Sequence, residues 1–152
     1  DLLLEEGAVE LPEGEFNAAF NPEAVVKVTD VLLASHENTA QIIDARPAAR
    51  FNAEVDEPRP GLRRGHIPGA LNVPWTELVR EGELKTTDEL DAIFFGRGVS
   101  YDKPIIVSCG SGVTAAVVLL ALATLDVTNV KLYDGAWSEW GARADLPVEP
   151  VK

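Results

Sequence analysis

The sequence is poor in the residues that form disulfides or bind metal ions. Its 152 residues include one cysteine, Cys109, and two histidines, His36 and His66. A single cysteine excludes a disulfide within the chain, and one thiol with two separated imidazoles does not make a metal-binding set. We therefore expect no metal and no cofactor. Because no secretory segment is recognisable, a reducing cytoplasmic compartment is the expected location.

Positive charge is scarce as well. The chain has 13 Lys and Arg residues against 25 Asp and Glu residues, which gives a formal net charge of −12. This balance disfavours non-specific binding to nucleic acid or to an anionic membrane surface. The longest apolar run, residues 115–125, is too short to cross a bilayer. We expect no nucleic-acid partner and no membrane partner, and a small anionic substrate would need a local cluster of arginines.

The chain contains no methionine, and its opening does not resemble the start of a folded domain. Residues 1–20 are rich in acidic residues and are interrupted by Gly7, Pro12 and Gly14, a composition typical of linkers. We interpret residues 1–20 as an interdomain linker or wrapping arm and residues 21–152 as one domain. The chain is therefore expected to be a fragment of a longer protein.

The rest of the sequence alternates strand-like apolar runs with helix-like segments. This alternation predicts one α/β domain, with a parallel sheet of about five strands and helices on both faces. The apolar run at 104–108 is typical of a central strand that is covered on both sides. Strands are predicted at 24–28, 40–46, 70–74, 104–108 and 130–133, and helices at 30–36, 90–95, 113–125 and 135–142. Thr29 is the expected cap of the first helix, and Thr86 with Glu89 a capping box for the second.

Cys109 lies where the strand-like run ends and a helix-like run begins, and two glycines follow it. Gly110, Gly112 and Ala115 match a dinucleotide-binding pattern, but that pattern normally belongs to the first strand–helix unit of a sheet, and here only one clear strand follows. A cysteine phosphatase would need an arginine six positions after the cysteine, where this chain has Ala115. Both interpretations are therefore disfavoured.

The third interpretation is sulfur transfer by a nucleophilic thiolate. In a loop that leads from a strand into a helix, backbone N–H groups converge and stabilise an anion, either a thiolate or a persulfide. A free cysteine is otherwise most often a small buried apolar residue, which its position before two glycines makes the weaker alternative. The predicted active-site loop consists of Cys109, Gly110, Ser111, Gly112, Val113 and Thr114.

Three motifs resemble the rhodanese family of sulfurtransferases: "GHIPGALNVPW" at 65–75, "CGSGVTA" at 109–115 and "YDGAWSEW" at 133–140. The resemblance covers about residues 20–147 and departs from the family at Leu62, where an aromatic residue is usual. It implies that Cys109 is the nucleophile and that this is the catalytic, second domain of two tandem rhodanese domains. The N-terminal rhodanese domain of the same enzyme would then be a partner that lines the active-site cleft.

Within the family, the chain resembles the members that take sulfur from 3-mercaptopyruvate. In relatives that prefer thiosulfate the two positions after the cysteine are basic, whereas here Gly110 and Ser111 bring no positive charge. The resemblance assigns the substrate carboxylate to Arg50 and Arg59, in the long loop at 47–69. Ser111 is predicted to donate to the departing enolate or to handle the thiol proton.

The neighbouring Arg63 and Arg64 are interpreted as solvated surface charges. His66 is expected to order the turn into the next strand, and Asp44 to hydrogen-bond within the loop that follows its strand. A further set of residues matches a family signature and is expected to pack near the cysteine loop without a chemical role. This set consists of Trp137, Glu139 and Trp140.

The expected reaction moves sulfur from 3-mercaptopyruvate, through a Cys109 persulfide, to cyanide, a small thiol or a reduced dithiol protein such as thioredoxin, and it releases pyruvate. A thiosulfate sulfurtransferase is the alternative within the same enzyme class. A persulfide carrier, which receives sulfur from a partner protein, is the alternative from another class and has no use for Arg50 and Arg59. A rhodanese-like domain with a purely structural role is disfavoured because the cysteine is present.

Overall fold

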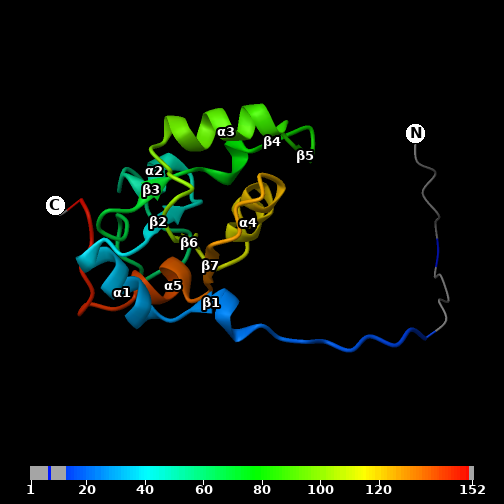
Figure 1. Cartoon of the computed structure of the whole chain (residues 1–152). Helices are drawn as coiled ribbons and strands as arrows, with labels where there is room; N and C mark the ends of the chain where they lie inside the picture. The colour runs from blue at the N-terminus through cyan, green and yellow to red at the C-terminus, as the bar shows by residue number, and fades with distance from the viewer. Residues whose placement is uncertain (1–6, 8–12, 151–152) are drawn as a thin grey trace.

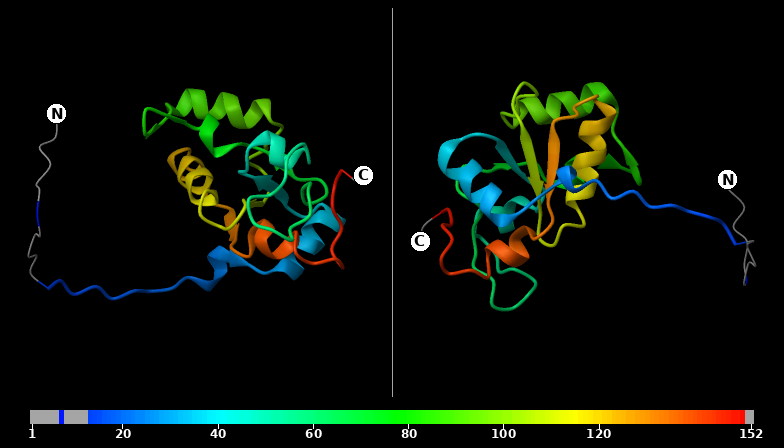
Figure 2. Two further views of the ribbon diagram at one scale, coloured as in Figure 1. Left: turned by 180° about the vertical axis from the view of Figure 1, so that it is seen from behind. Right: turned by 60° about the horizontal axis from the view of Figure 1, so that its bottom comes forward.

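The computed structural model describes residue 7 and residues 13–150 (Figure 1). Residues 1–6 and 8–12 of the predicted arm lie outside the described residues. Residues 13–20 have no regular secondary structure, and their side chains are exposed. This segment leads away from the domain in each view (Figures 1 and 2). Its interpretation as an interdomain linker stays a prediction.

Five parallel strands form the central sheet, in the order β1-β7-β6-β2-β3. Their bounds, in chain order, are β1 Val25–Val26, β2 Gln41–Asp44, β3 Leu71–Asn72, β6 Ile105–Ser108 and β7 Val130–Tyr133. The predicted five-stranded parallel sheet is confirmed. The two edge strands are shorter than predicted. β3 is bounded on one side by a turn in which Ala70 N–H donates to the Ile67 carbonyl, and on the other by Pro74, which has no N–H.

Helices cover both faces of this sheet, as predicted (Figures 1 and 2). Successive residues of β6 alternate between the two resulting cores: Ile105 and Val107 face one, and Ile106 faces the other. Both faces are buried, which explains the continuous apolar sequence of this strand. The first core contains α3 Thr87–Gly96, α4 Ala115–Thr124 and the 3₁₀ turn η2 Trp75–Glu77, and the second contains α1 Val28–Glu37 and α5 Ala136–Trp140. The short helix α2 Ala48–Phe51 and the 3₁₀ turn η1 Pro22–Ala24 complete these elements.

Two helices begin at positions other than those predicted. Helix α1 begins at Val28, because the Asp30 carboxylate accepts the Lys27 N–H and makes Lys27, rather than Thr29, the N-cap. Helix α4 begins at Ala115, and Val113 before it is 73% exposed. The capping box of Thr86 and Glu89 at α3 is confirmed.

A small antiparallel hairpin, β4 Val79–Arg80 with β5 Glu83–Leu84, was not predicted. Its turn consists of Glu81 and Gly82, which have φ values of 54° and 87°. Positive φ at both central residues is the geometry of the tight turns that join antiparallel strands. Glutamate is an uncommon residue for such a position, and the sequence therefore carried little signal for this turn.

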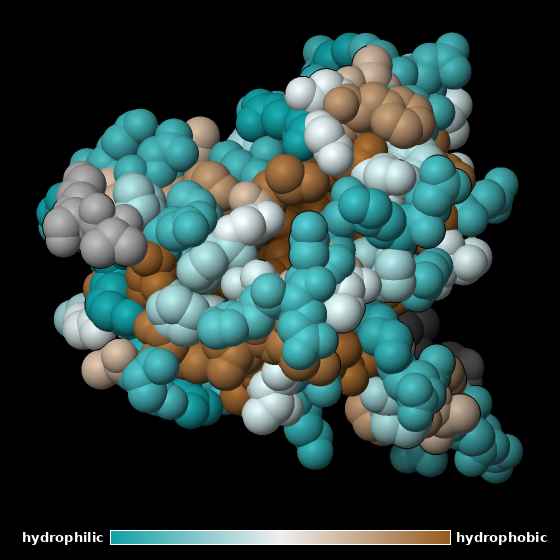
Figure 3. Space-filling model, turned by 60° about the vertical axis from the view of Figure 1, so that its left-hand side comes forward, coloured by the Kyte–Doolittle hydropathy of each residue, from teal (hydrophilic) through white to brown (hydrophobic). Residues whose placement is uncertain are grey.

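Hydrophilic residues make up most of the face drawn in Figure 3, with hydrophobic residues visible in the hollows between them. None of the helices in the described part of the chain has the length and apolar character that a membrane crossing requires.

The start of helix α5 is hydrogen-bonded to the loop that begins at Cys109. The Trp137 N–H donates to the Cys109 carbonyl over 2.9 Å, and the Ser138 N–H donates to the Gly110 carbonyl over 3.0 Å. Ala136, directly before these two donors, has a φ of 53°. This value lies in the left-handed region, which disfavours residues with a Cβ. Ala136 is completely buried, so the surrounding packing maintains this conformation.

Replacement of Ala136 by glycine should therefore be better tolerated than the same change at Ala121, which is equally buried but lies within α4. Both changes remove one buried methyl group. For Ala121→Gly we expect a loss of about 1 to 2 kcal/mol in the free energy of unfolding. For Ala136→Gly the loss should be about 1 kcal/mol smaller, because glycine relieves the left-handed strain. Urea unfolding of both variants measures the difference, and equal losses would contradict the strain at Ala136.

Candidate functional site

The cysteine loop lies at the carboxyl edge of the sheet, where ligands of parallel α/β sheets bind. Strand β6 ends at Ser108, which is in register with Asp44 at the end of β2. The Ala45 N–H donates to the Ser108 carbonyl over 2.9 Å and continues the pairing up to the loop. Cys109 follows immediately and forms no disulfide.

Two glycines allow other parts of the chain to approach this loop closely. A Cβ at Gly110 would lie 2.8 Å from Nη2 of Arg50, and a Cβ at Gly112 would lie 2.7 Å from Oδ1 of Asp134. Gly112 also has a φ of +85°, which a residue with a side chain adopts only at a cost. Gly110 therefore serves the approach of Arg50, and Gly112 the curvature of the loop. The binding of an anion by this loop stays a prediction.

A cavity of about 250 Å³ opens beside this loop. It brings together Arg50 and Arg59 from the long loop with Ser111 from the cysteine loop, all three of which were predicted site residues. Cys109, Gly112 and Val113, also predicted, are not among the lining residues. The complete lining is Arg50, Glu57, Pro58, Arg59, Leu62, Gly110, Ser111 and Thr114.

Cys109 itself is buried, with 1% of its surface exposed, and packs in the core beneath helices α3 and α4. It directly precedes Gly110, which lines the cavity. The burial agrees with the alternative in which the cysteine is a small apolar residue, whereas its place next to the cavity agrees with the predicted nucleophile. A thiolate here would be shielded from bulk water, with the carboxyl end of β6 on one side and the start of α4 on the other.

A buried network of charges supports the cavity. The Glu57 carboxylate, whose side chain is 1% exposed, binds two guanidinium groups, those of Arg46 and Arg50. The Arg46 guanidinium also pairs with Asp44 at 2.6 Å, and its central carbon lies 4.3 Å from the centre of a Trp137 ring. The predicted role of Asp44 within its loop is therefore confirmed. The predicted packing role of Trp137 is confirmed as well.

Arg59 is the exception in this network. Among the residues that the structure describes, it has no carboxylate within ion-pair distance, and its hydrogen bond runs from Nη1 to Ser138 Oγ over 2.6 Å. The carboxylates of Asp44 and Glu57 balance the guanidinium groups of Arg46 and Arg50. Two positive and two negative charges cancel, and Arg59 adds one positive charge to the cavity that no carboxylate in the network compensates.

Glu57 and Ser138 were missed by the sequence analysis. Glu57 stands in the acidic segment "AEVDEPRP" at 53–60, which reads as a solvated surface. Ser138 belongs to the segment at 133–140 that was recognised, but a single serine between Trp137 and Glu139 gives no individual signal. The proximity of Glu57 to Arg50 and Arg59 in the sequence was the one available hint of an internal counter-ion.

The interpretation of Arg63 as a solvated surface charge was wrong. Its guanidinium donates to the carbonyls of four residues around the end of α5, and burial lowers its pKa from the ordinary arginine value. The acceptors are Trp140, Gly141, Arg143 and Leu146. The last carbonyls of a helix have no N–H partner within the helix, and the Arg63 guanidinium supplies the missing donors. Arg64 is exposed as predicted and pairs with Asp56 at 2.7 Å.

A ring stack at the end of α2 and a side-chain hydrogen bond at α5 hold the two helices that carry Arg50 and Ser138. His66 stacks on Phe51 with ring centres 3.7 Å apart, and its Nδ1 lies 2.8 Å from the Phe51 carbonyl, which fixes the end of α2 next to Arg50. His66 therefore has a structural role, as predicted, but its ring contacts hold the end of α2 rather than the turn into β3. The Tyr133 hydroxyl donates to Glu139 over 2.7 Å, and burial together with this bond raises the pKa of Tyr133. The hydroxyl thus stays protonated and braces α5.

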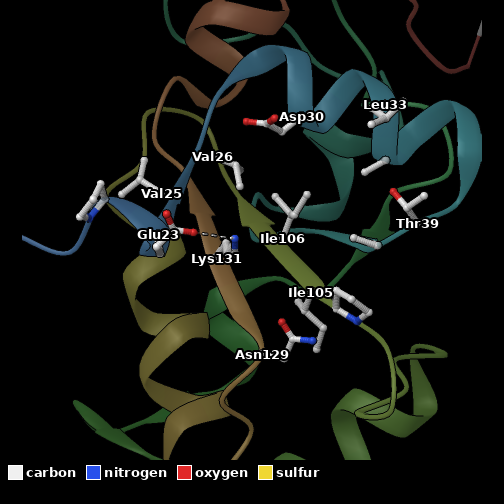
Figure 4. Close-up of a pocket in the computed structure, with 14 residues that line it drawn as sticks. Glu23, Val25, Val26, Asp30, Leu33, Thr39, Ile105, Ile106, Asn129 and Lys131 are labelled. Atoms are coloured by element: carbon white, nitrogen blue, oxygen red, sulfur yellow. Dashed lines mark ion pairs between the residues drawn. The ribbon is translucent and has the colours of Figure 1, made fainter.

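A second cavity, of about 430 Å³, lies at the opposite, amino ends of the strands (Figure 4). Its lining includes Ile105 and Ile106 at the start of β6, and Lys131, which pairs with Glu23 at 4.0 Å. None of the predicted site residues lines it. Because this end of a parallel sheet is not where ligands bind in such folds, the smaller cavity beside Cys109 is the candidate site. Within the described ranges, no group of three or more His, Cys, Asp or Glu residues could hold a metal ion.

A profile of the rhodanese-like domain matches residues 27–143, which include every residue of the candidate site. The chain belongs to the rhodanese family. The fold of this rhodanese domain is the one expected from the three motifs.

Known rhodanese proteins of high similarity carry related names. The chain is 99% identical over its 152 residues to the 3-mercaptopyruvate sulfurtransferase of Escherichia coli K12, and this match covers 54% of that protein. A crystal structure of SseA from E. coli, described as a 3-mercaptopyruvate sulfotransferase, superimposes with a TM-score of 0.78 at 96% identity, covering 91% of this chain and 51% of the other. A mitochondrial thiosulfate/3-mercaptopyruvate sulfurtransferase of Arabidopsis thaliana is 41% identical over 90% of this chain and 36% of its own length. The chain therefore spans about half the length of the E. coli sequence and of the SseA chain in the crystal structure, and less of the plant protein.

Replacement of Glu57 by glutamine should destabilise the domain strongly, because two guanidinium groups would lose a shared counter-ion. Since Arg46 is 1% exposed, we expect a loss of about 3 kcal/mol in the free energy of unfolding. Asp56→Asn is the matched control. This neighbouring carboxylate is 80% exposed and pairs with Arg64 at the surface, so its removal should have little effect. Urea unfolding compares the two, and equal losses would contradict the central place of Glu57.

Proposed function

We propose that this domain moves sulfur from 3-mercaptopyruvate to a thiophilic acceptor through a persulfide on Cys109. The observation that carries the proposal is the single uncompensated positive charge of Arg59 in a cavity beside the cysteine loop. 3-Mercaptopyruvate has one carboxylate, whereas thiosulfate is a compact dianion. One net positive charge suits the monoanion better. The 99% identity to an E. coli protein named for 3-mercaptopyruvate supports the same donor.

In the proposed reaction the substrate carboxylate binds Arg59, and Arg50 assists from the adjacent wall of the cavity. The Cys109 thiolate attacks the sulfur of the donor. An S–S bond forms while the C–S bond of the donor breaks, and the electron pair of that bond moves to the methylene carbon. The resulting enolate takes up a proton and leaves as pyruvate, and the former donor sulfur remains on Cys109 as a persulfide.

Ser111 is the proposed proton relay for this step: it passes a proton to the enolate and takes up the proton that the S–H group of the donor releases as the persulfide anion forms. Its hydroxyl belongs to the cavity lining and can donate to the enolate oxygen as negative charge develops there. The backbone N–H groups of the loop from Gly110 to Thr114, at the start of α4, then stabilise the persulfide anion. Gly112 and Val113 shape this loop rather than contact the donor.

The second half-reaction returns the cysteine to its starting state. An acceptor such as cyanide, a small thiol or a reduced dithiol protein such as thioredoxin attacks the outer sulfur. The S–S bond breaks, and its electron pair returns to Cys109 as the thiolate. We place this chemistry in the reducing cytoplasm, where a thiolate persists. The relatives are about twice as long as this chain, and we propose that a preceding rhodanese domain, joined through residues 1–20, completes the cleft.

The test is the intact mass of the complete natural protein after brief exposure to 3-mercaptopyruvate and, separately, to thiosulfate. We expect the gain of one sulfur atom from 3-mercaptopyruvate, and no gain in the Cys109→Ser variant. A gain from thiosulfate alone would favour the thiosulfate sulfurtransferase instead. A gain from neither donor, with loading only from a persulfidated partner protein, would favour the carrier.

Arg59→Ala should slow persulfide loading from 3-mercaptopyruvate by about ten-fold or more, because the variant loses a charge-assisted bond to the carboxylate. Arg64→Ala is the matched control, since Arg64 lies in the same loop, is exposed and pairs with Asp56 instead of lining the cavity. It should load at the rate of the unchanged protein. Loading rates come from mass spectra recorded over time. Equal rates in the two variants would contradict a substrate role for Arg59.

A further inference from the structure

Ser138 connects the two halves of the candidate site through one hydroxyl group. Its Oγ lies 2.6 Å from the Gly110 carbonyl oxygen and 2.6 Å from Nη1 of Arg59. A carbonyl can only accept and a guanidinium can only donate. The single hydroxyl proton therefore goes to Gly110, and an oxygen lone pair accepts the bond from Arg59. Both bonds exist together without competition.

The hydroxyl is itself held firmly in place. Ser138 belongs to α5, and its backbone N–H donates to the same Gly110 carbonyl over 3.0 Å. Its neighbour Trp137 is buried, and the Trp137 indole N–H donates to the Arg63 carbonyl over 2.9 Å. Backbone and side chain of Ser138 thus both bind the cysteine loop, which fixes the side-chain rotamer relative to Cys109.

Arg59, by contrast, has no other anchor within the part of the chain that the structure describes. Arg50 is held by both carboxylate oxygens of Glu57, but the exposed Arg59 side chain bonds to Ser138 alone. A long unanchored side chain samples many rotamers in water. The position of the one uncompensated charge therefore depends on Ser138.

We propose that Ser138 is a positioning residue that sets the affinity for the anionic donor by holding the Arg59 guanidinium at a fixed place beside the cysteine loop. The inference rests on the proposed function, in which Arg59 binds the donor carboxylate. Ser138 does not touch the reacting atoms. It acts on binding through Arg59, while the sulfur-transfer step itself belongs to the cysteine loop.

The test uses single-turnover persulfide loading of the complete natural protein over a range of 3-mercaptopyruvate concentrations. For Ser138→Ala the donor concentration at half-maximal loading should rise about ten-fold, while the maximal rate stays within about two-fold. Ser138→Thr keeps the hydroxyl and should restore most of the affinity. The matched control is Ser35→Ala, since Ser35 is also partly buried and donates to a backbone carbonyl, that of Pro68, away from the site.

A double-mutant cycle with Arg59→Ala separates positioning from a structural role. If Ser138 acts through Arg59, Ser138→Ala should have little further effect once Arg59 is absent. The inference would be overturned if the effects of Ser138→Ala and Arg59→Ala were additive. It would also be overturned if Ser138→Ala lowered the maximal loading rate and left the half-maximal donor concentration unchanged, because Ser138 would then act on the cysteine loop and not on Arg59. If the unchanged protein gained no sulfur from 3-mercaptopyruvate, the proposed function would be overturned instead. Loading of the unchanged protein is therefore measured before the variants are compared.

Discussion

The Glu57 carboxylate, shared between the guanidinium groups of Arg46 and Arg50, is the interaction on which the candidate site depends. A buried charge is tolerated only when it is paired and hydrogen-bonded. Arg46 pairs with both Glu57 and Asp44, which lies at the end of β2, and Arg50 pairs with Glu57 and lies against Gly110 of the cysteine loop. The long loop at 47–69 is thereby fixed to the sheet by charge, although it has little regular structure of its own.

Charge balance within this network decides what the cavity can bind. Four of its charges cancel in buried or partly buried pairs, so Arg59 alone presents a free positive charge. The cavity can therefore attract an anion even though the whole chain has a net charge of −12. Different residues thus hold the long loop in place and bind the anion. Glu57 and Arg46 make the loop rigid, and Arg59, held by Ser138, recognises the anion.

Apolar periodicity was enough to predict the sheet and its two helical layers. β6 reads as a central strand because both of its faces are buried, and the loop expected after Cys109 leads into helix α4 as predicted. The contacts that were missed are those between polar residues distant in sequence. Arg63 meets carbonyls about 80 positions away, and Ser138 meets Arg59 across 79 positions. No local pattern encodes such pairs, because each partner alone looks like an ordinary surface residue.

The central claim is that one unpaired positive charge makes this cavity selective for a monoanionic donor. The most direct measurement is the rate of persulfide loading from thiosulfate in the complete natural protein and in its Ser111→Lys variant, which adds a second positive charge to the cavity lining. The loss of a hydroxyl cannot by itself assist the dianion. An absolute rise in loading from thiosulfate is therefore the predicted result. An unchanged or lower rate, in a variant that remains folded, would contradict the claim that charge selects the donor.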